Sequence, residues 1–168
     1  MEGEMTAIRP AIPADVPTIL QFVRELAEYE RDLAAVKATE VSLGTALFGD
    51  DPAAECVIAE ADSGAVGFAL FFRNFSTWTG KPGLYLEDLY VTPDARGTGA
   101  GKALLAHLAR LCVERGWGRF EWAVLDWNTP AVGFYRALGA TSQDEWTVYR
   151  LTGDALEDLA AISTNPAR

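Results

Sequence analysis

The stretch best suited to bind an anion is a short basic turn, Arg96-Gly97-Thr98-Gly99-Ala100-Gly101. Glycines let the backbone approach a ligand closely. The first N–H groups of a following helix lack partners and point outward at the positive end of the helix dipole. Arg96 adds a positive charge at the edge of this glycine turn (96–101). The turn predicts a phosphate or pyrophosphate site, and the alternative is a glycine-rich turn that binds no ligand.

The spacing of the glycines separates the known kinds of phosphate loop. A P-loop requires G-x-x-x-x-G-K-[ST], but Gly97 and Gly101 are one residue too close, and Ala103 stands where the magnesium-binding hydroxyl is needed. A dinucleotide-binding turn requires G-x-G-x-x-G, and its third glycine would fall on Lys102. Both patterns are therefore disfavoured, although magnesium-dependent ATP binding would revive the first.

The elements on either side must position this turn. Residues 84–91 are rich in apolar and aromatic side chains, as expected of a half-buried strand. Thr92-Pro93-Asp94 ends the strand, since proline cannot donate to a sheet and favours turns. After the turn, one apolar helical face is formed by Leu104, Leu105, Leu108, Leu111 and Cys112. His107 lies on the flank of this helix, where surface packing is the expected role.

The rest of the chain alternates between strand and helix patterns. We expect helices over 15–30 (with Asp15 as cap), 39–49 (with Thr39 as cap), 129–138 and 153–162. We expect further strands over 7–9, 55–61, 65–73, 119–125 and 146–151, and a loop over 74–83. Asp62-Ser63-Gly64 reads as a hairpin turn. This order predicts one mixed α/β domain over 1–168, with its core at about 7–151 and a frayed tail over 163–168.

Composition excludes several classes of protein. The chain has 168 residues and a formal net charge of −10 from 24 acidic and 14 basic side chains, which argues against a general nucleic-acid binder. No apolar run approaches the ~20 residues of a membrane span, and no secretory signal is visible at the N-terminus. Cys56 and Cys112 form no metal or redox motif and are expected in the core. A reduced cytoplasmic protein without a metal is the simplest expectation.

A second motif lies downstream, in Asn128-Thr129-Pro130-Ala131-Val132-Gly133-Phe134-Tyr135-Arg136-Ala137-Leu138-Gly139-Ala140. The run N-x-P-A-x-x-F-Y-x-x-x-G-A resembles the second half of the signature of the GNAT superfamily of N-acetyltransferases. Arg96, Gly99 and Gly101 match its first half, R/Q-x-x-G-x-G/A. The chain is more narrowly similar to the spermidine/spermine N-acetyltransferase family, which includes diamine and thialysine N-acetyltransferases.

Four stretches carry the narrower resemblance, which covers about residues 7–151: Ile8-Arg9-Pro10-Ala11, Leu26-Ala27-Glu28-Tyr29-Glu30, Tyr85-Leu86-Glu87-Asp88-Leu89-Tyr90-Val91 and Ala123-Val124-Leu125-Asp126-Trp127-Asn128. The family often has an acidic pair, a glycine and a tryptophan near its end. This chain has Asp144-Glu145-Trp146 without the glycine, which weakens the assignment of Glu145.

The resemblance implies a GNAT fold, a twisted mixed sheet with helices on both faces. Its central strands, here 84–91 and 119–125, splay apart, and acetyl-CoA enters between them. The pantetheine arm would pair with the backbone of Leu89, Tyr90 and Val91 and with Asn128, for which an Asx-type helix cap is the alternative. The pyrophosphate would bind at Arg96, Gly97, Thr98, Gly99, Ala100, Gly101 and Lys102. Tyr135 would lie at the sulfur of coenzyme A.

Acetyl transfer from a thioester to an amine requires removal of a proton from the ammonium and protonation of the leaving thiolate. Amines of the lysine type titrate at about 10, so deprotonation matters at neutral pH. Tyr135 is the best general acid, because a phenol with a pKa of about 10 suits a thiolate; the alternative is a core aromatic. Glu87 is the best base, directly or through a water; the alternative is a solvated edge carboxylate. Asp88 is kept in reserve, because a bulge would break the strand alternation that separates it from Glu87.

Tyr29 and Glu30 match the substrate-contacting pair of the family. With Glu87 and Glu145 they would form an acidic, aromatic-lined pocket for a cation; the alternative is a helix end with solvated charges. We expect an acetyl-CoA-dependent N-acetyltransferase that acts directly, without an acetyl-cysteine, on a polyamine, a diamine or a lysine-like amino acid. The alternatives are acetylation of protein N-termini or lysines, and a non-catalytic acyl-CoA-binding module. The resemblance also implies a homodimer.

Overall fold

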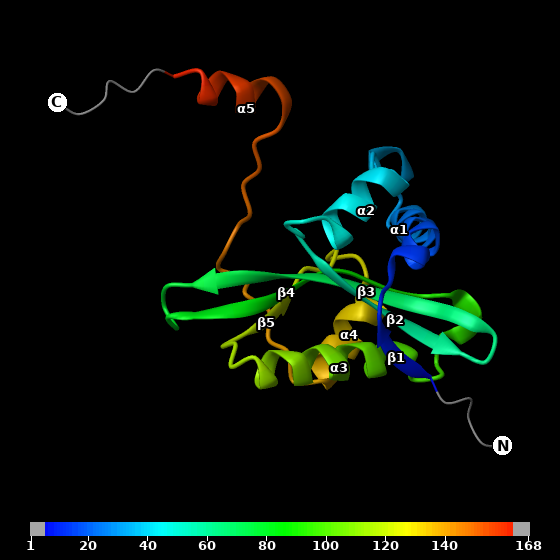
Figure 1. Ribbon diagram of the computed structural model, residues 1–168. Helices are drawn as coiled ribbons and strands as arrows, with labels where there is room; N and C mark the ends of the chain where they lie inside the picture. The colour runs from blue at the N-terminus through cyan, green and yellow to red at the C-terminus, as the bar shows by residue number, and fades with distance from the viewer. Residues whose placement is uncertain (1–5, 163–168) are drawn as a thin grey trace. The chain divides into compact units, whose positions relative to one another are not determined.

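The computed structural model describes residues 6–162, so the expected frayed tail, 163–168, lies outside the described residues. The chain divides after Leu125 into two compact units, which are described separately. The first unit carries the sheet β1–β5 and the helices α1–α3, and the second carries α4 and α5 (Figure 1). None of the helices in residues 6–162 is long and apolar enough to cross a membrane.

The first unit contains a five-stranded mixed sheet whose order follows the chain, β1-β2-β3-β4-β5. Its first four strands are antiparallel neighbours, and β5 lies parallel to β4. The strands are β1 (Ala7–Pro10), β2 (Glu55–Ala61), β3 (Gly64–Ser76), β4 (Lys81–Val91) and β5 (Phe120–Trp122). The helices of this unit are α1 (Val16–Tyr29), α2 (Glu40–Phe48) and α3 (Ala100–Glu114), with short 3-10 turns at Pro13–Asp15, Leu33–Ala35 and Pro93–Ala95.

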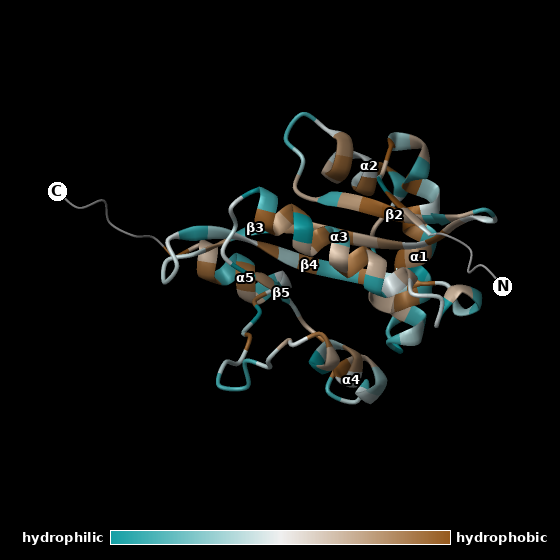
Figure 2. Ribbon diagram, turned by 90° about the horizontal axis from the view of Figure 1, so that it is seen from below, coloured by the Kyte–Doolittle hydropathy of each residue, from teal (hydrophilic) through white to brown (hydrophobic). Residues whose placement is uncertain are grey.

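Helices cover both faces of this sheet, α1 and α2 on one side and α3 on the other (Figure 1). Ile19 and Phe22 of α1 pack with Leu47 of α2 against the sheet residues Ile58 and Phe68. On α3, the fully buried side chains are Leu104 and Leu108. Apolar residues alternate with polar ones along α3, as expected of a helix with one buried face (Figure 2). Each fully buried leucine or phenylalanine contributes about 1.5–3 kcal/mol.

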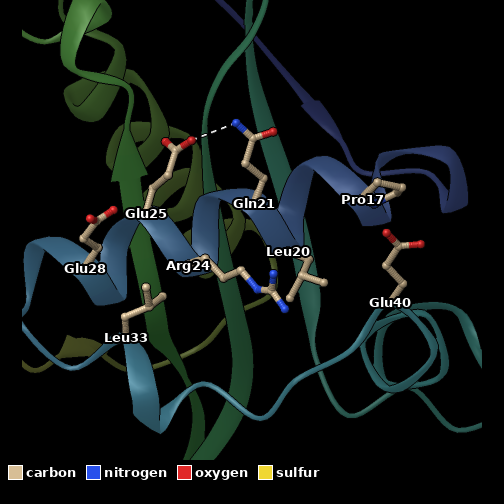
Figure 3. Close-up of a pocket in the computed structure, with 8 residues that line it drawn as sticks. All are labelled: Pro17, Leu20, Gln21, Arg24, Glu25, Glu28, Leu33 and Glu40. Carbon is tan, nitrogen blue, oxygen red and sulfur yellow. Dashed lines mark hydrogen bonds between the residues drawn. The ribbon is translucent and has the colours of Figure 1, made fainter.

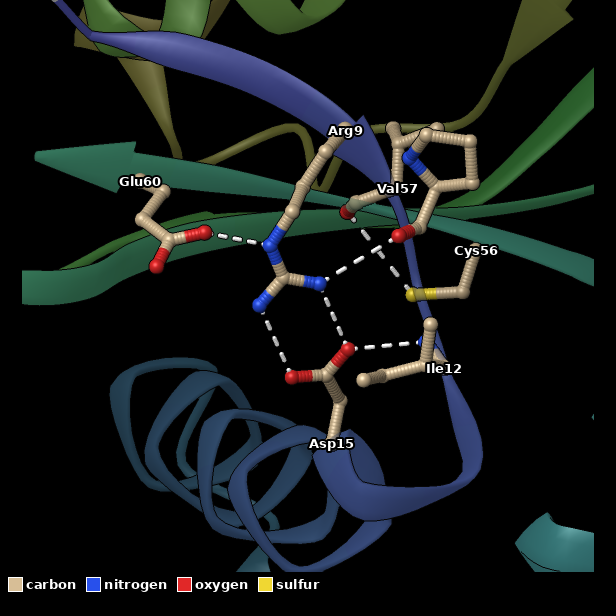
Figure 4. A network of polar contacts seen from close by, with 7 residues as sticks. Arg9, Ile12, Asp15, Cys56, Val57 and Glu60 are labelled. Atoms are coloured by element: carbon tan, nitrogen blue, oxygen red, sulfur yellow. Dashed lines mark hydrogen bonds and ion pairs between the residues drawn. The ribbon is translucent and has the colours of Figure 1, made fainter.

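The link between β1 and α1 corrects one expectation about Asp15. This residue precedes α1 as predicted, but its carboxylate does not cap the helix. It accepts bonds from Nη1 of Arg9 at 2.7 Å and from the backbone N–H of Ile12 at 2.8 Å (Figure 4). Arg9 also pairs with Glu60 of β2. These bonds lower the pKa of Asp15, with Arg9 as the main cause. The predicted cap at Thr39 is confirmed, because its hydroxyl accepts the N–H of Ser42.

Two strand boundaries differ from the expected ones. The loop predicted over 74–83 is wrong, because β3 runs to Ser76 and β4 begins at Lys81, which leaves a tight turn closed by a bond from the N–H of Gly80 to the carbonyl of Ser76. Conversely, the strand predicted over 119–125 is confined to β5, Phe120–Trp122. Both boundaries depend on which backbone groups pair across the sheet, and residue types along one segment do not determine that pairing.

The second unit contains α4 (Thr129–Ala137) and α5 (Gly153–Ala160), both close to their predicted positions. Gly139 follows α4 with φ of +89°, as the predicted glycine at a helix end requires. The strand predicted over 146–151 is wrong, because these residues have no regular structure. A strand needs a hydrogen-bonded partner, and residues 126–162 supply none of their own.

Candidate active site

The predicted strand–turn–helix is present in the first unit as β4, the glycine turn and α3. Gly97 and Gly99 have φ of +79° and +94°, in the left-handed region where glycine is favoured. The space beside both Cα atoms is open. Gly99 precedes α3, and no side chain caps the helix, so its first N–H groups are available to an incoming anion. The open backbone and the helix end therefore fit a phosphate group.

Arg96 adds a positive charge to this turn, and neighbouring residues hold its side chain in place. Its Nε–H donates to the carbonyl of Val91 at 3.1 Å. Its guanidinium carbon lies 5.4 Å from the ring centroid of Tyr29 and 5.8 Å from that of Tyr90. The expected substrate residue Tyr29 is therefore in contact with the expected cofactor residue Arg96. The hydroxyl of Tyr90 in turn donates to Glu25 at 2.5 Å.

Sequence reasoning did not identify Glu25. Helical spacing is the sequence feature that could have identified it, because Glu25 and Tyr29 are four residues apart and share one face of α1. Burial, followed by the bond to Glu25, raises the pKa of Tyr90 to about 12. Tyr90 is thus a neutral core side chain, and only its backbone remains a candidate for contact with pantetheine.

The edge of β4 that faces β5 is paired over only part of its length. β5 pairs with Leu84, Tyr85 and Leu86, and residues 87–91 continue beyond the last pair. On its other side, β4 remains paired with β3 as far as Val91. The pairing with β5 therefore ends where the resemblance expects the splay. Backbone groups of β4 beyond Leu86 can accept an extended ligand as an added strand.

β4 contains a bulge at Glu87. Leu86 lies opposite Phe71 and Asp88 lies opposite Leu70, so Glu87 is an extra residue between consecutive pairs. An extra residue breaks the alternation of side chains along the strand. Asp88 therefore shares the face of Leu70, which packs in the core against α1 and α2, whereas Glu87 is exposed. The strand bulge that the sequence analysis allowed for is therefore present, and it lies at Glu87, the candidate base.

Glu30, Glu87 and Asp88 are here called the acidic group, because the charges of Glu87 and of the distant Glu30 both act on Asp88. Asp88 is half-buried, and its pKa is raised to about 6 by burial first and then by the negative charges of Glu87 and Glu30. Burial also raises the pKa of Glu30. The chain thus places negative charge from Glu30 and Glu87 near Asp88, an arrangement that suits a cation.

The remaining predicted site residues belong to the second unit. Asn128 precedes α4, and its side chain does not cap the helix, so the alternative role as an Asx-type cap is not supported. Tyr135 lies on α4 with its ring 5.6 Å from that of Phe134. Glu145 follows in a segment without regular structure. A site that combines these residues with Glu87 and Arg96 stays a prediction.

Other expected roles are structural. Cys56 and Cys112 are buried, as predicted, and burial raises the pKa of the Cys56 thiol to about 12. Among the described residues, no three His, Cys, Asp or Glu side chains are placed so that they could together hold a metal ion. A cavity of about 310 Å³ lies beside α1, between this helix, the 3-10 turn that holds Leu33 and the start of α2 (Figure 3). Its lining combines apolar and charged side chains but none of the predicted site residues: Pro17, Leu20, Gln21, Arg24, Glu25, Glu28, Leu33 and Glu40.

The family model described as Acetyltransferase (GNAT) family matches residues 20–140. This range includes both the glycine turn and the motif around Tyr135. The chain therefore belongs to the GNAT acetyltransferase family and is an N-acetyltransferase. Enzymes of this family use acetyl-CoA.

Individual relatives agree with this class. The chain is 40% identical over 164 residues to thialysine N-epsilon-acetyltransferase from Sus scrofa, covering 91% of this chain and 96% of the relative. It is 32% identical to L-ornithine N5-acetyltransferase from Arabidopsis thaliana, covering 93% and 88%. Among solved structures, an integron cassette protein from the mobile metagenome of V. cholerae matches with a TM-score of 0.77 and 27% identity over 93% of this chain and 98% of that one.

Proposed function

We propose that the protein transfers the acetyl group of acetyl-CoA directly to a primary amine of a small cation: a polyamine, a diamine or a lysine-like amino acid. The observation that carries this proposal is that β4 bears Glu87 and Asp88 at its bulge and is followed, after one short 3-10 turn, by the glycine turn. One strand thus connects a cation site with an anion site. Relatives named for thialysine and L-ornithine favour an amine at the end of an amino-acid side chain.

For the cofactor, we propose that the glycine turn, including Lys102, binds the pyrophosphate. The backbone of Leu89, Tyr90 and Val91 would receive the pantetheine arm with the help of Asn128. The open space beside Gly97 and Gly99 and the uncapped start of α3 support this assignment. Acetyl-CoA supplies an activated thioester, whose acyl–sulfur bond breaks as the amide bond forms.

For the proton transfers, we assign binding of the ammonium to the acidic group, with Glu145 as a further candidate. Glu87 and Asp88 together remove the proton, and the half-buried Asp88 is the member whose surroundings favour holding it. A substrate cation would offset the neighbouring negative charges that raise the pKa of Asp88. Tyr135 donates its phenolic proton to the leaving thiolate. The nitrogen of the bound ammonium loses two protons: the carboxylates take one before attack and pass it to solvent, and the other leaves as the amide forms. Because the thiolate gains one proton from Tyr135 and the phenolate is reprotonated, one proton is released per turnover.

The test is turnover by purified protein with acetyl-CoA and thialysine, ornithine, a diamine, a polyamine or a lysine-containing peptide, followed by the release of free thiol. We expect turnover on small amines and little on the peptide. Turnover on the peptide alone would establish protein acetylation instead. Binding of acetyl-CoA without turnover on any amine would favour an acyl-CoA-binding module.

Tyr135→Phe tests the general acid, with Tyr149→Phe as a control that makes the same chemical change elsewhere. We expect Tyr135→Phe to lower kcat by about 10²–10⁴-fold and to retain acetyl-CoA binding. Equal turnover by the two variants would remove Tyr135 from the mechanism.

We further propose a single catalytic domain, supported by a family match that runs across both units. A homodimer is the assembly implied by the family resemblance, and a cytoplasmic location is the expectation from the composition. Sedimentation should give twice the mass of one chain, and a monomer at micromolar concentration would contradict this.

A further inference from the structure

The guanidinium of Arg96 is held by three contacts with residues of α1 and β4. Its Nε–H bonds the carbonyl of Val91, and the rings of Tyr29 and Tyr90 lie 5.4 and 5.8 Å from its central carbon. A cation within about 6 Å of an aromatic ring is attracted to that ring. The side chain that supplies the charge of the glycine turn is therefore oriented before any ligand arrives.

The two rings differ in how firmly they are held. Tyr90 is only 6% exposed, its ring is 5.6 Å from that of Phe22, and its hydroxyl is bonded to Glu25. Tyr29 is the last residue of α1 and is 41% exposed. Tyr90 is thus a fixed support in the core, whereas Tyr29 can be replaced without opening the core.

An exposed arginine has large rotamer freedom, which is lost when it binds an anion. Contacts that restrict the side chain in the free protein reduce this loss and so strengthen binding. The planar guanidinium suits this role, because it stacks on aromatic rings and keeps N–H groups directed at phosphate oxygens.

We propose that Tyr29 is a positioning residue of the pyrophosphate site: its ring, with that of Tyr90, holds Arg96 ready for the cofactor. This inference rests on the proposed function, because it takes the glycine turn as the site of the pyrophosphate. Tyr29 acts through Arg96 and contacts no reacting atom. Its neighbour Glu30 belongs to the acidic group, so the end of α1 serves both the cofactor and the amine.

The first measurement is the affinity of coenzyme A for the full-length protein by calorimetry. We expect Tyr29→Leu to weaken binding about two- to five-fold, and Tyr29→Phe to match the wild type because it keeps the ring. Phe75→Leu is the matched control, because it removes an exposed ring near the end of β3 that lies away from the glycine turn. It should leave the affinity for coenzyme A unchanged. Melting temperatures of all variants check that they are folded.

The second measurement separates positioning of Arg96 from a general structural role. In Arg96→Gln, adding Tyr29→Leu should cause no further loss of affinity, because the ring no longer has a cation to hold. With acetyl-pantetheine as donor, which lacks the pyrophosphate, Tyr29→Leu should leave the donor KM unchanged, whereas the KM for acetyl-CoA rises.

Three results would overturn the inference. Unchanged coenzyme A affinity with a raised amine KM would assign Tyr29 to the amine alone. An equal increase in KM for acetyl-pantetheine would show a general structural effect. Additive losses in the double variant would show that Tyr29 acts independently of Arg96. Failure of the wild-type protein to bind coenzyme A would instead overturn the proposed function, on which the inference rests.

Discussion

The glycine turn and the acidic group are built in different ways. The turn is one unbroken stretch, and its shape comes from glycines with positive φ and from the start of α3. The acidic group takes Glu30 from the end of α1 and Glu87 and Asp88 from β4. Its properties arise from burial and from charges far apart in sequence. A backbone site of the first kind suits a shared cofactor, whereas a side-chain site of the second kind suits selection among amines.

The largest effect that would test this contrast is expected from Asp88→Asn. If Asp88 holds the proton as proposed, its removal should lower kcat/KM for the amine by about 10²–10⁴-fold. Coenzyme A affinity, measured by calorimetry, should change less than about two-fold, because the glycine turn is unchanged. Glu87→Gln is the matched comparison, and its loss should be smaller because Glu87 is exposed. A larger loss in Glu87→Gln would make Glu87 the acceptor.

Arg96→Gln should produce the opposite pattern. Loss of a charge-assisted contact to phosphate costs about 1.5–3 kcal/mol, so coenzyme A affinity should fall about 10–100-fold. The amine KM at saturating acetyl-CoA should remain close to that of the wild type. A large rise in amine KM would show that the two sites are not separable.

The raised pKa of Asp88 predicts a cost in stability. Its folded value of about 6 exceeds the ordinary value of about 3.9, so the folded state binds more protons between these pH values. Ionisation of Asp88 therefore destabilises the folded state, and the free energy of unfolding falls as pH rises from about 4 to 6. At pH 7, Asp88→Asn should raise that free energy by about 1–3 kcal/mol, measured by urea unfolding.

Asp15→Asn is the matched control for that stability effect, because its carboxylate has the opposite environment. Arg9 lowers the pKa of Asp15, so this group stabilises the fold above its unfolded pKa, and the gain is lost as pH falls through the folded pKa. Asp15→Asn should therefore destabilise the protein at pH 7. If both variants shifted stability in the same direction, the raised pKa of Asp88 would not be the cause.

Gly99→Ala is expected to have the smallest effect. At a φ of +94°, a side chain adds strain of about 1–2 kcal/mol, although the space around it is open. Unfolding by urea should show this loss, and coenzyme A affinity should fall as the turn distorts. Gly44→Ala in α2, also in open space, should instead stabilise the helix by about 0.5–1 kcal/mol. Equal effects of the two variants would show that the positive φ is not required.

Prediction of the fold from sequence succeeded where the signal was local. β2 matches its predicted bounds at Glu55–Ala61, and Thr39 caps α2 as expected. The extensions of β3 and β4, the shortness of β5 and the missing strand over 146–151 were not predicted. Each of these depends on whether a distant backbone segment pairs, and residue types within the segment carry little information about that.

The sequence by itself determined the glycine turn and the helix that follows it, because glycine spacing and helical periodicity act over a few residues. The cofactor followed from the resemblance to a family and not from the spacing. Only the tertiary structure decided which carboxylates share a field and which aromatic ring holds Arg96. The bulge at Glu87 places Asp88 on the face of the sheet covered by α1, and burial there raises its pKa. Tyr29 contacts Arg96 because the end of α1 packs near the end of β4. Such contacts join residues more than fifty positions apart, and only the folded chain brings them together.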